Sequence, residues 1–395
     1  MASGFDNHSP LQLVSGYMIF SVEKTSDTSL ARAGLVSLPH GQVQTPIFMP
    51  IGTAGSVKGL TVGDLDMVNA QIILGNTYHL WQRPGLEVMQ KAGGLHKFGG
   101  WEKPILTDSG GFQAFSLSKI RKFTEDGVTF RSQINGDKMF LSPEVSMQIQ
   151  TIIGSDIALV LDECLPAEVT HLEAKRAMYR TRRWAERSKI EFDRLKTETG
   201  NQNRLFGIPQ GAQFNDLRIE SAKLTMELDL PGYSIGGVAN GGEPEEIMYS
   251  QVQTQTEILE NHKPRHLLGV GTPKDIVQMV ARGIDMFDCV YPTRNARHGT
   301  VFFEAGENSY LSERIAKQQY KFDFSPINVN SQIPELRMYT KAYLRHLFAA
   351  GELLAYRLAT LNNLEFYLNL TTKIRTKILD STFDNWWQGY DRVKN

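Results

Sequence analysis

The stretch GIDMFDCVYPTRNARHG, Gly283–Gly299, places two acids in a short apolar run and follows them with a turn that carries two arginines. The run has the apolar, β-prone character of a strand that is buried on both faces. Asp288 stands where this strand would end, and Arg294 and Arg297 follow within the next turn of chain. The stretch therefore predicts a buried strand that presents a carboxylate beside cationic side chains.

Seven other short β-rich runs end in the same way, in a polar or glycine cluster. They are Thr45–Thr53, Ala70–His79, Pro104–Gly111, Asp156–Cys164, Arg204–Gly211, Gly232–Gly242 and Arg265–Pro273. Segments with apolar residues at helical spacings of three and four separate most of them. Buried strands that alternate with helices predict an α/β fold with a parallel sheet, and eight such units predict a closed (β/α)8 TIM barrel. In such a barrel the carboxyl ends of the strands carry the active site.

Two parts of the chain depart from this alternation. Lys119–Glu144 contains Asp-Gly and Asn-Gly turns between β-prone stretches, which predicts a small antiparallel β insertion. From about residue 304 to 395 the pattern becomes that of a C-terminal helical region. Because no repeat, low-complexity tract or linker separates these parts, residues 1–395 are expected to form a single barrel domain with additions.

The composition is that of an ordinary globular protein, with 395 residues, 41% hydrophobic and 22% charged, and a net charge of −1. Its two cysteines, Cys164 and Cys289, cannot build a disulfide framework or a metal site of three or four thiolates. The chain begins without a signal-peptide pattern and has no apolar run of membrane-spanning length, so a cytoplasmic protein without membrane association is expected. At this net charge a nucleic-acid partner would need a local basic patch.

Three carboxylates are expected at strand ends: Asp108 in LTDSGGFQ, Asp162 in LVLDEC, and one of Asp285 and Asp288. Because side chains alternate along a strand, Asp285 and Asp288 point to opposite sides, and Asp288 is nearer the carboxyl end. A single strand-end aspartate is explained equally well as a helix N-cap. Three at one rim instead predict a nucleophile, a general acid or base, and a group that recognises the donor edge of a substrate.

Glycines and cations beside these acids indicate the kind of substrate. The clusters DSGGF and IGGV leave backbone N–H groups open to close approach, and Phe112 can either stack on a planar ring or fill the core. With the amide of Gln210, these groups match the edges of a guanine-like base. Arg294 and Arg297 can hold phosphate or base edges. Further charge, which a solvated helix face would also explain, comes from Arg176, Arg180, Arg182, Arg183 and Arg187.

The sequence resembles the tRNA-guanine transglycosylases along nearly its whole length. The likeness is carried by GNTYHLWQRPG, LTDSGGFQ, LDEC, FGIPQG, IGGVA, KPRHLLGVG and GIDMFDCVYPTRNARHG. The resemblance implies a (β/α)8 barrel that exchanges guanine at the wobble position of tRNA for a 7-deazaguanine base without cutting the backbone. It also implies that the reaction passes through a covalent intermediate between the RNA and an aspartate.

The resemblance assigns roles residue by residue. Asp288 matches the nucleophile and Asp108 the general acid and base. The substrate-binding positions are Ser109, Gly110, Gly111, Phe112, Asp162, Cys164, Gln210, Gly236, Gly237 and Val238. The RNA-binding positions are Gly269, Val270, Gly271, Thr272, Pro273, Lys274 and Asp275 in one loop, and Thr293, Arg294, Asn295, Ala296 and Arg297 in the other.

The chain departs from the family pattern in two places. The family holds a structural zinc with a Cys-x-Cys-x2-Cys cluster and a later His, but the matching positions here are Ser331, Ile333, Leu336 and Asn362. These side chains cannot replace thiolates and an imidazole, so we expect no zinc and no other cofactor, with apolar packing in its place. The second departure is GGVANGGE, where Asn240 and Gly241 add one residue to the bacterial pattern, whereas Cys164 matches that pattern. Both 7-aminomethyl-7-deazaguanine and queuine therefore stay open as the incoming base.

Two other functions also stay open. A barrel glycoside hydrolase uses paired carboxylates near an anomeric carbon, although it does not need the arginine turn. A non-catalytic tRNA-binding partner subunit, as eukaryotic members use, loses the reactive carboxylates and tends to keep the zinc ligands, which is the reverse of this chain. The partners implied by the resemblance are tRNA with a GUN anticodon, a free 7-deazaguanine base, and a second copy of the chain in a homodimer.

Overall fold

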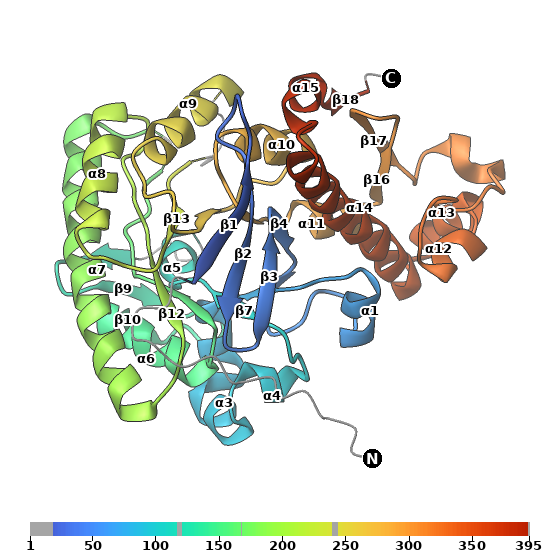
Figure 1. Ribbon diagram of the computed structural model, residues 1–395. Helices are drawn as coiled ribbons and strands as arrows, with labels where there is room; N and C mark the ends of the chain where they lie inside the picture. Colours follow the sequence, from blue (N-terminus) through green and yellow to red (C-terminus); the bar gives the residue numbers. More distant parts are fainter. Residues whose placement is uncertain (1–18, 117–120, 167, 239–243, 394–395) are drawn as a thin grey trace, which may run out of the picture.

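The computed structural model describes residues 19–116, 121–166, 168–238 and 244–393, and its centre is a parallel β-barrel (Figure 1). The barrel strands are β4 (Ile47–Met49), β5 (Ile51–Gly52), β6 (Ile73–Gly75), β7 (Ile105–Thr107), β11 (Ile157–Leu159), β12 (Arg204–Gly207), β13 (Gly232–Ile235), β14 (Arg265–Leu267) and β15 (Met286–Asp288). Pro50 separates β4 from β5, so these two are halves of one strand. The eight predicted strands and the barrel are thereby confirmed.

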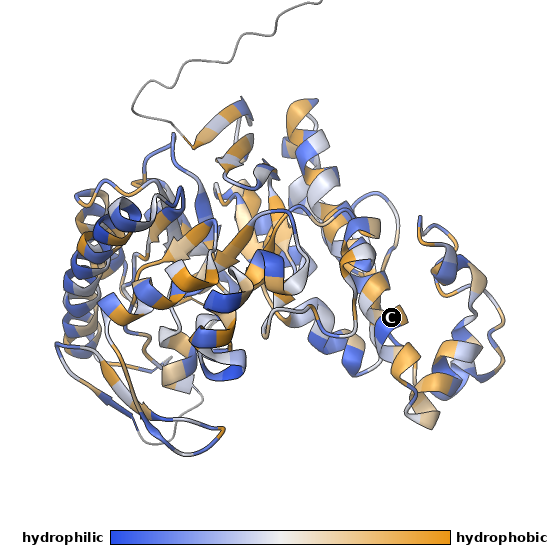
Figure 2. Ribbon diagram, turned by 90° about the horizontal axis from the view of Figure 1, so that it is seen from below, coloured by the Kyte–Doolittle hydropathy of each residue, from blue (hydrophilic) through white to orange (hydrophobic). Residues whose placement is uncertain are grey.

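The two halves of the first strand close the barrel. β4 pairs in parallel with the last strand, β15, and β5 pairs in parallel with the second, β6. Between them the carbonyl of Pro50, whose nitrogen cannot donate, accepts a hydrogen bond from the Leu74 N–H at 3.0 Å. The strands are short and almost wholly buried, and the apolar colour in Figure 2 gathers along them.

Helices surround the barrel and follow its strands in turn. The first group is α1 (Val62–Met67), α2 (Thr77–Leu80), α3 (Leu86–Ala92), α4 (Leu95–Gly99) and α5 (Gly111–Ser116). The second group is α6 (Pro143–Ile153), α7 (His171–Thr199), α8 (Asn215–Met226), α9 (Glu245–Thr256), α10 (Pro273–Ala281) and α11 (Tyr291–Arg297). Each barrel strand therefore delivers its carboxyl end to a loop that leads into a helix, as expected for this fold.

The predicted antiparallel insertion is confirmed. β8 (Arg121–Phe123), β9 (Val128–Arg131) and β10 (Lys138–Leu141) form a three-stranded sheet in the order β10-β9-β8. The Asp-Gly turn at Gly127 and the Asn-Gly turn at Gly136 connect these strands, and both glycines have positive φ.

A second antiparallel sheet, which the sequence analysis did not predict, covers the amino ends of the barrel strands. It consists of β1 (Phe20–Thr25), β2 (Arg32–Leu38) and β3 (Gly41–Thr45). From β2, Arg32 makes a buried ion pair with Asp285, at 2.8 Å from Nε to Oδ1 and 2.6 Å from Nη2 to Oδ2. Asp285 also accepts the backbone N–H of Arg265 at 2.7 Å. Asp285 is thus a structural anchor at the end of β15 that faces away from Asp288.

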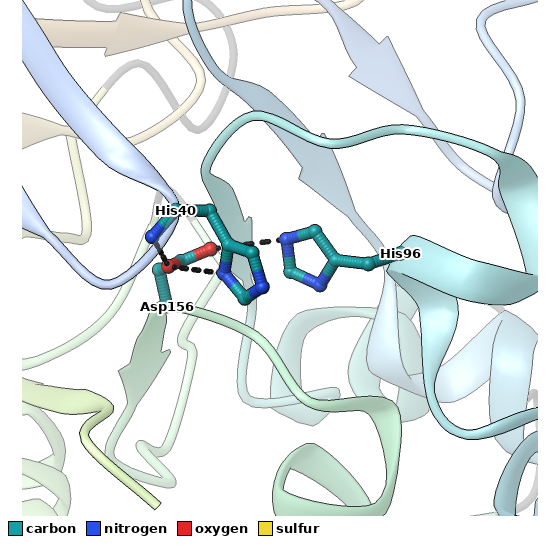
Figure 3. A group of neighbouring side chains, drawn as sticks. All are labelled: His40, His96 and Asp156. Carbon is teal, nitrogen blue, oxygen red and sulfur yellow. Dashed lines mark hydrogen bonds and ion pairs between the residues drawn. The ribbon is translucent and has the colours of Figure 1, made fainter.

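Three side chains fasten the turn between β2 and β3 to the barrel (Figure 3). Asp156, just before β11, lies 2.8 Å from His40 Nδ1 and 3.2 Å from His96 Nε2. Burial raises the pKa of Asp156, but hydrogen bonds from His96, the Ile105 N–H and His40 outweigh it and lower the pKa. In the described part of the chain this is the one group of three His, Cys, Asp or Glu side chains with ligand atoms within 4.8 Å. The two imidazole rings stack with their centroids 3.7 Å apart, and a nitrogen of each lies near the Asp156 carboxylate.

The C-terminal region is mainly helical, as predicted, but it begins with β-structure. β16 (Thr300–Glu304) and β17 (Ser309–Arg314) form a hairpin that the short β18 (Asp391–Arg392) joins. The helices are α12 (Pro334–Met338), α13 (Lys341–Ala350), α14 (Leu353–Leu379) and α15 (Phe383–Trp386). Asn363 of α14 donates to the carbonyls of Pro292 and Thr300 at 3.0 and 2.9 Å and accepts from the Phe302 N–H at 3.0 Å. This buried amide fixes α14 to α11.

The four positions matched to the zinc ligands are buried, and hydrogen bonds satisfy their polar atoms. Ser331 donates to Glu365 at 2.5 Å, and Asn362 donates to the Phe302 carbonyl at 2.9 Å. Ile333 and Leu336 are fully buried. One hydroxyl, one amide and two alkyl groups do not fit a tetrahedral zinc, which needs thiolate, imidazole or carboxylate donors. In the described residues, no helix is long and apolar enough to cross a membrane.

The buried ion pair generates a stability prediction. Replacing Asp285 with Ala should lower the free energy of unfolding by about 3–5 kcal/mol, because the charge of Arg32 is then buried without its partner. The double variant Arg32→Met/Asp285→Leu should lose less, since neither charge remains. Urea denaturation measures all three proteins, with Glu87→Ala, from an exposed ion pair, as the control. A loss for Asp285→Ala no larger than that for Glu87→Ala would contradict the anchoring role.

Candidate active site

A pocket of about 520 Å³ opens at the carboxyl ends of the barrel strands. All eight strands contribute to its wall: Thr53, Asn76, Asp108, Asp162, Gln210, Gly236, Gly269 and Asp288 each follow or end a different strand. The closed barrel therefore gathers residues from positions 51 to 288 at one rim, where the sequence predicts the active site.

Asp288, the last residue of β15, lies in this pocket and is 8% exposed. Its Oδ1 lies 2.9 Å from His266 Nε2 and accepts the Gly269 N–H at 3.2 Å. Asp285 points away from the pocket, toward Arg32, as the two-residue alternation of a strand requires. Of the two acids in the run, Asp288 is thus the one that can meet a ligand.

Asp108, after β7, lies on the pocket wall within a set of hydrogen-bond donors. The amides of Asn76 and Gln113 donate to its Oδ2 at 2.5 and 2.6 Å, and the Thr77 N–H donates to its Oδ1 at 2.8 Å. The pKa of Asp108 is raised to about 6, mainly by burial. The three hydrogen-bond donors lower this pKa, and the charge of Asp288 raises it slightly. A carboxyl group with this pKa can both give and take a proton near neutral pH.

Asp162 and Gln210 form the polar floor of the pocket. The Gln210 amide donates to Asp162 Oδ2 at 2.7 Å, and the Ser109 hydroxyl donates to Oδ1 at 3.1 Å. The Cys164 thiol lies 3.4 Å from the same carboxylate. Burial raises the pKa of Asp162 and raises that of the Cys164 thiol further. This arrangement places hydrogen-bond acceptors and donors close together on the pocket wall, where they can meet the edge of a polar ligand.

The glycine loop after β13 lies beside this floor. Arg218 is fully buried and donates to the carbonyls of Gly236 at 3.1 Å and Gly237 at 2.6 Å. Because the C=O and N–H of a trans peptide point in opposite directions, the Gly237 N–H faces away from Arg218. Gly237 has φ +67°, and a Cβ there would lie 2.2 Å from Gln210 Oε1, so only glycine fits. Val238 completes the wall, whereas Asn240 and Gly241 lie outside the described residues.

The DSGGF segment contributes unevenly to the pocket. Ser109 and Phe112 line it, and Phe112 is 53% exposed, so it is available for stacking rather than part of the core. Gly110 and Gly111 do not line it and instead form the turn into α5. A Cβ on Gly111 would lie 2.9 Å from the Asp162 carbonyl, so this glycine allows the two segments to pack closely.

The first expected RNA-binding loop is largely committed to protein contacts. Thr272 caps α10 and bonds with Asp275, which also accepts from Tyr249 at 2.8 Å. Lys274 lies 3.0 Å from Glu245 in an ion pair. Val270, Gly271 and Pro273 have no polar side chain, and the Gly271 carbonyl accepts the Tyr367 hydroxyl at 2.7 Å. Of this loop, only Gly269 reaches the pocket.

The second expected RNA-binding segment forms α11, which leads away from Asp288. Thr293 and Ala296 are on the buried face of this helix. Arg294 is exposed and lines the pocket. Asn295 and Arg297 are partly exposed. Within the described residues neither Arg294 nor Arg297 forms an ion pair with a carboxylate. The positive charge of Arg294, which lines the pocket, is therefore available to a ligand there, and Arg297 lies one helical turn further along α11.

Most arginines of α7 (His171–Thr199) are paired with acids of the protein itself. Of the five arginines that the sequence analysis named, four form ion pairs: Arg180 with Glu163, Arg182 with Glu186, Arg183 with Glu125, and Arg187 with Glu144. Arg194, further along the same helix, pairs with Glu191 and Glu198. Neutralised by these partners, the helix adds little net charge to the site, and the solvated-face interpretation accounts for it.

Sequence reasoning missed several residues that shape the site. Asn76 and Gln113 hold Asp108, Arg218 holds the glycine loop, and His266 holds Asp288. Only His266 carried a usable signal, since a polar residue at an inward position of an apolar strand needs a partner. Arg218 stands on a helix among exposed polar residues, so its burial could not be inferred from the local pattern.

Comparisons with known proteins agree with this geometry. The model of the family described as queuine tRNA-ribosyltransferase matches residues 27–394. A protein of that name from Neisseria meningitidis serogroup A is 52% identical over 356 residues, which cover 90% of this chain and 93% of the relative. Proteins of the same name from Delftia acidovorans and Chromobacterium violaceum are each 49% identical, over 92% and 93% of this chain and 95% and 96% of their own lengths. The chain therefore belongs to the queuine tRNA-ribosyltransferase family.

Proposed function

We propose that this chain is a tRNA-guanine transglycosylase that replaces guanine at the wobble position of tRNAs with GUN anticodons by a 7-deazaguanine base, in queuosine modification. Membership of the family supports the reaction class. The observation that carries the chemistry is the presence of Asp288 and Asp108 in one pocket, together with the polar side chains of Asp162 and Gln210. The same observation disfavours the non-catalytic partner subunit, which would not need either acid.

The exchange takes two displacements at one sugar carbon. In the first, a carboxylate oxygen of Asp288 bonds to C1′ of the nucleotide, the bond from C1′ to guanine N9 breaks, and Asp108 gives its proton to the departing guanine. In the second, the incoming base passes its N9 proton to Asp108 and bonds to C1′, and the ester to Asp288 breaks. Asp108 ends protonated and Asp288 ionised, as they began. Two inversions retain the configuration of the sugar.

The pocket floor supports recognition of a deazaguanine. Asp162 can accept from the ring N–H and exocyclic amine, while Gln210 and the Gly237 N–H can meet the carbonyl edge. Phe112 can stack on the ring, and Arg294 and Arg297 can meet phosphates or neighbouring bases. A base with 7-aminomethyl-7-deazaguanine chemistry and queuine are both compatible with these groups. A tRNA substrate also fits the cytoplasmic location expected from the composition.

A homodimer is part of the proposal. The C-terminal region exposes large apolar side chains, which is typical of surfaces that contact another protein. The most exposed of them are Phe322, Phe324, Val329, Met338 and Leu353, between 63% and 81%. A second copy of the chain is the partner that the family resemblance implies.

The proposed function is tested by base exchange and by trapping the intermediate. The purified protein, incubated with tRNA labelled at the wobble guanine and with each candidate base, should release labelled guanine. Denaturing gels should show a slower protein–RNA band. Asp288→Asn should abolish both signals but keep tRNA binding, because phosphate contacts position the RNA. Asp285→Asn is the matched control: its soluble folded fraction should still form the band.

Two outcomes would contradict the proposal. Absence of guanine release from wild-type protein with every GUN tRNA and base would remove the function itself. Full exchange by Asp288→Asn would leave the reaction but assign the nucleophile elsewhere.

The pKa of Asp108 predicts opposite pH dependence for the two half-reactions. Guanine departure needs the protonated acid, so its rate should fall as pH rises through about 6, by up to tenfold for each further pH unit. Attack by the incoming base needs the ionised form, so its rate should fall as pH drops below that value. Single-turnover guanine release and the reaction of isolated intermediate with base measure the two separately. Asp108→Asn should flatten both profiles, and parallel slopes in wild type would count against the assignment.

We also propose that the zinc site of the family is absent. Ordinary burial replaces it, at about 1.5–3 kcal/mol for each fully buried large apolar side chain such as Ile333 or Leu336. Elemental analysis should find less than one zinc per chain, and a strong chelator should change neither melting temperature nor exchange rate. Zinc bound at one per chain and released only on unfolding would show that other residues have rebuilt the site.

A further inference from the structure

His266 lies at the centre of the barrel wall beside the proposed nucleophile. It belongs to β14, is fully buried, and pairs in register with Ser234 of β13 on one side and Met286 of β15 on the other. Because side chains two residues apart share a face, Asp288 projects to the same side as Met286 and therefore as His266. Ser234, His266 and Asp288 thus form a row across three adjacent strands.

The row is connected by hydrogen bonds. Ser234 Oγ lies 3.0 Å from His266 Nδ1, and His266 Nε2 lies 2.9 Å from Asp288 Oδ1. A carboxylate oxygen can only accept, so the ring must carry its N–H on Nε2 toward Asp288. In the neutral ring Nδ1 is then an acceptor, and the Ser234 hydroxyl donates to it. The carboxylate of Asp288 thus sets the tautomer, and the Ser234 hydroxyl, which can donate or accept, satisfies the remaining ring nitrogen.

Both donors to Asp288 bind the same oxygen. His266 Nε2 and the Gly269 N–H each reach Oδ1, at 2.9 and 3.2 Å. Oδ2 receives no hydrogen bond from the residues that the structure describes. Since nucleophilic attack needs an uncommitted lone pair, the two oxygens are already distinguished before substrate binds.

We propose that His266 is a positioning residue that fixes Asp288 Oδ1 so that Oδ2 attacks C1′. In the resulting ester, Oδ1 becomes the carbonyl oxygen and keeps its donors from His266 and Gly269. When the second base bonds to C1′, the C1′–Oδ2 bond breaks and its electron pair returns to the carboxylate, whose charge the same two donors stabilise. No proton moves through His266. This inference rests on the proposed function.

Three substitutions of His266 distinguish the effect of its hydrogen bond to Asp288 from the effect of its volume in the barrel wall. His266→Gln can place an amide N–H near the former Nε2, His266→Asn can reach only toward the former Nδ1, and His266→Leu removes both. His262→Leu is the matched control, because His262 is an exposed histidine just before the same strand. The measurements are single-turnover formation of the protein–RNA ester, its reaction with incoming base, the KM for tRNA, and melting temperature.

His266→Leu and His266→Asn should both slow ester formation and ester turnover by roughly 10- to 100-fold, because a hydrogen bond to a charged group is lost. The KM for tRNA should stay within about twofold, since the phosphate contacts are unchanged. His266→Gln should recover most of the rate, and His262→Leu should match wild type.

Several results would overturn the inference. One is a wild-type rate for His266→Leu; another is a rate for His266→Gln as low as that for His266→Asn at equal melting temperature. If rate falls only in proportion to the folded fraction, His266 is structural. Failure of wild-type protein to form the ester would instead remove the proposed function, so the two failures are distinguishable.

Discussion

The parallel pairing of the first barrel strand with the last is the contact on which the rest of the molecule depends. Because β4 pairs with β15 and β5 with β6, the sheet has no free edge, and because all pairings are parallel, the carboxyl ends form one closed rim. Asp288 then shares a pocket with residues from as early in the chain as Ile51. Without closure, the acids at positions 108, 162 and 288 would be spread along an open sheet. The chemistry is therefore a consequence of the topology.

Much of the fold and part of the site could be predicted from the sequence, because both depend on local periodicity. The alternation of side chains along a strand predicted that Asp285 and Asp288 point in opposite directions, and short apolar runs predicted the eight strands. The N-terminal sheet escaped because β1 is mostly exposed and polar, without the apolar run that marked the barrel strands. The family resemblance predicts that Lys274 and Asp275 bind RNA. In the structure they pair with Glu245 and Tyr249, which belong to another helix, α9. Such pairings depend on tertiary contacts that no local pattern records.

The region matched to the zinc site shows how one fold can be held in two ways. A bound metal stabilises a region through four bonds to one ion. Here the stabilisation is spread over two hydrogen bonds, from Ser331 to Glu365 and from Asn362 to the Phe302 carbonyl, and over the burial of Ile333 and Leu336. A distributed arrangement has no single ligand whose loss unfolds the element.

Helix α14 contacts parts of the molecule that lie far apart in the sequence. Its Arg357 pairs with Asp64, its Tyr367 with the Gly271 carbonyl, and its Arg375 with the carbonyls of Gly34 and Thr45. These contacts join both ends of the barrel to a helix that comes after all the barrel strands in the chain. A chain shortened before residue 353 would lack all of these contacts, and the barrel would then be without its brace along this side.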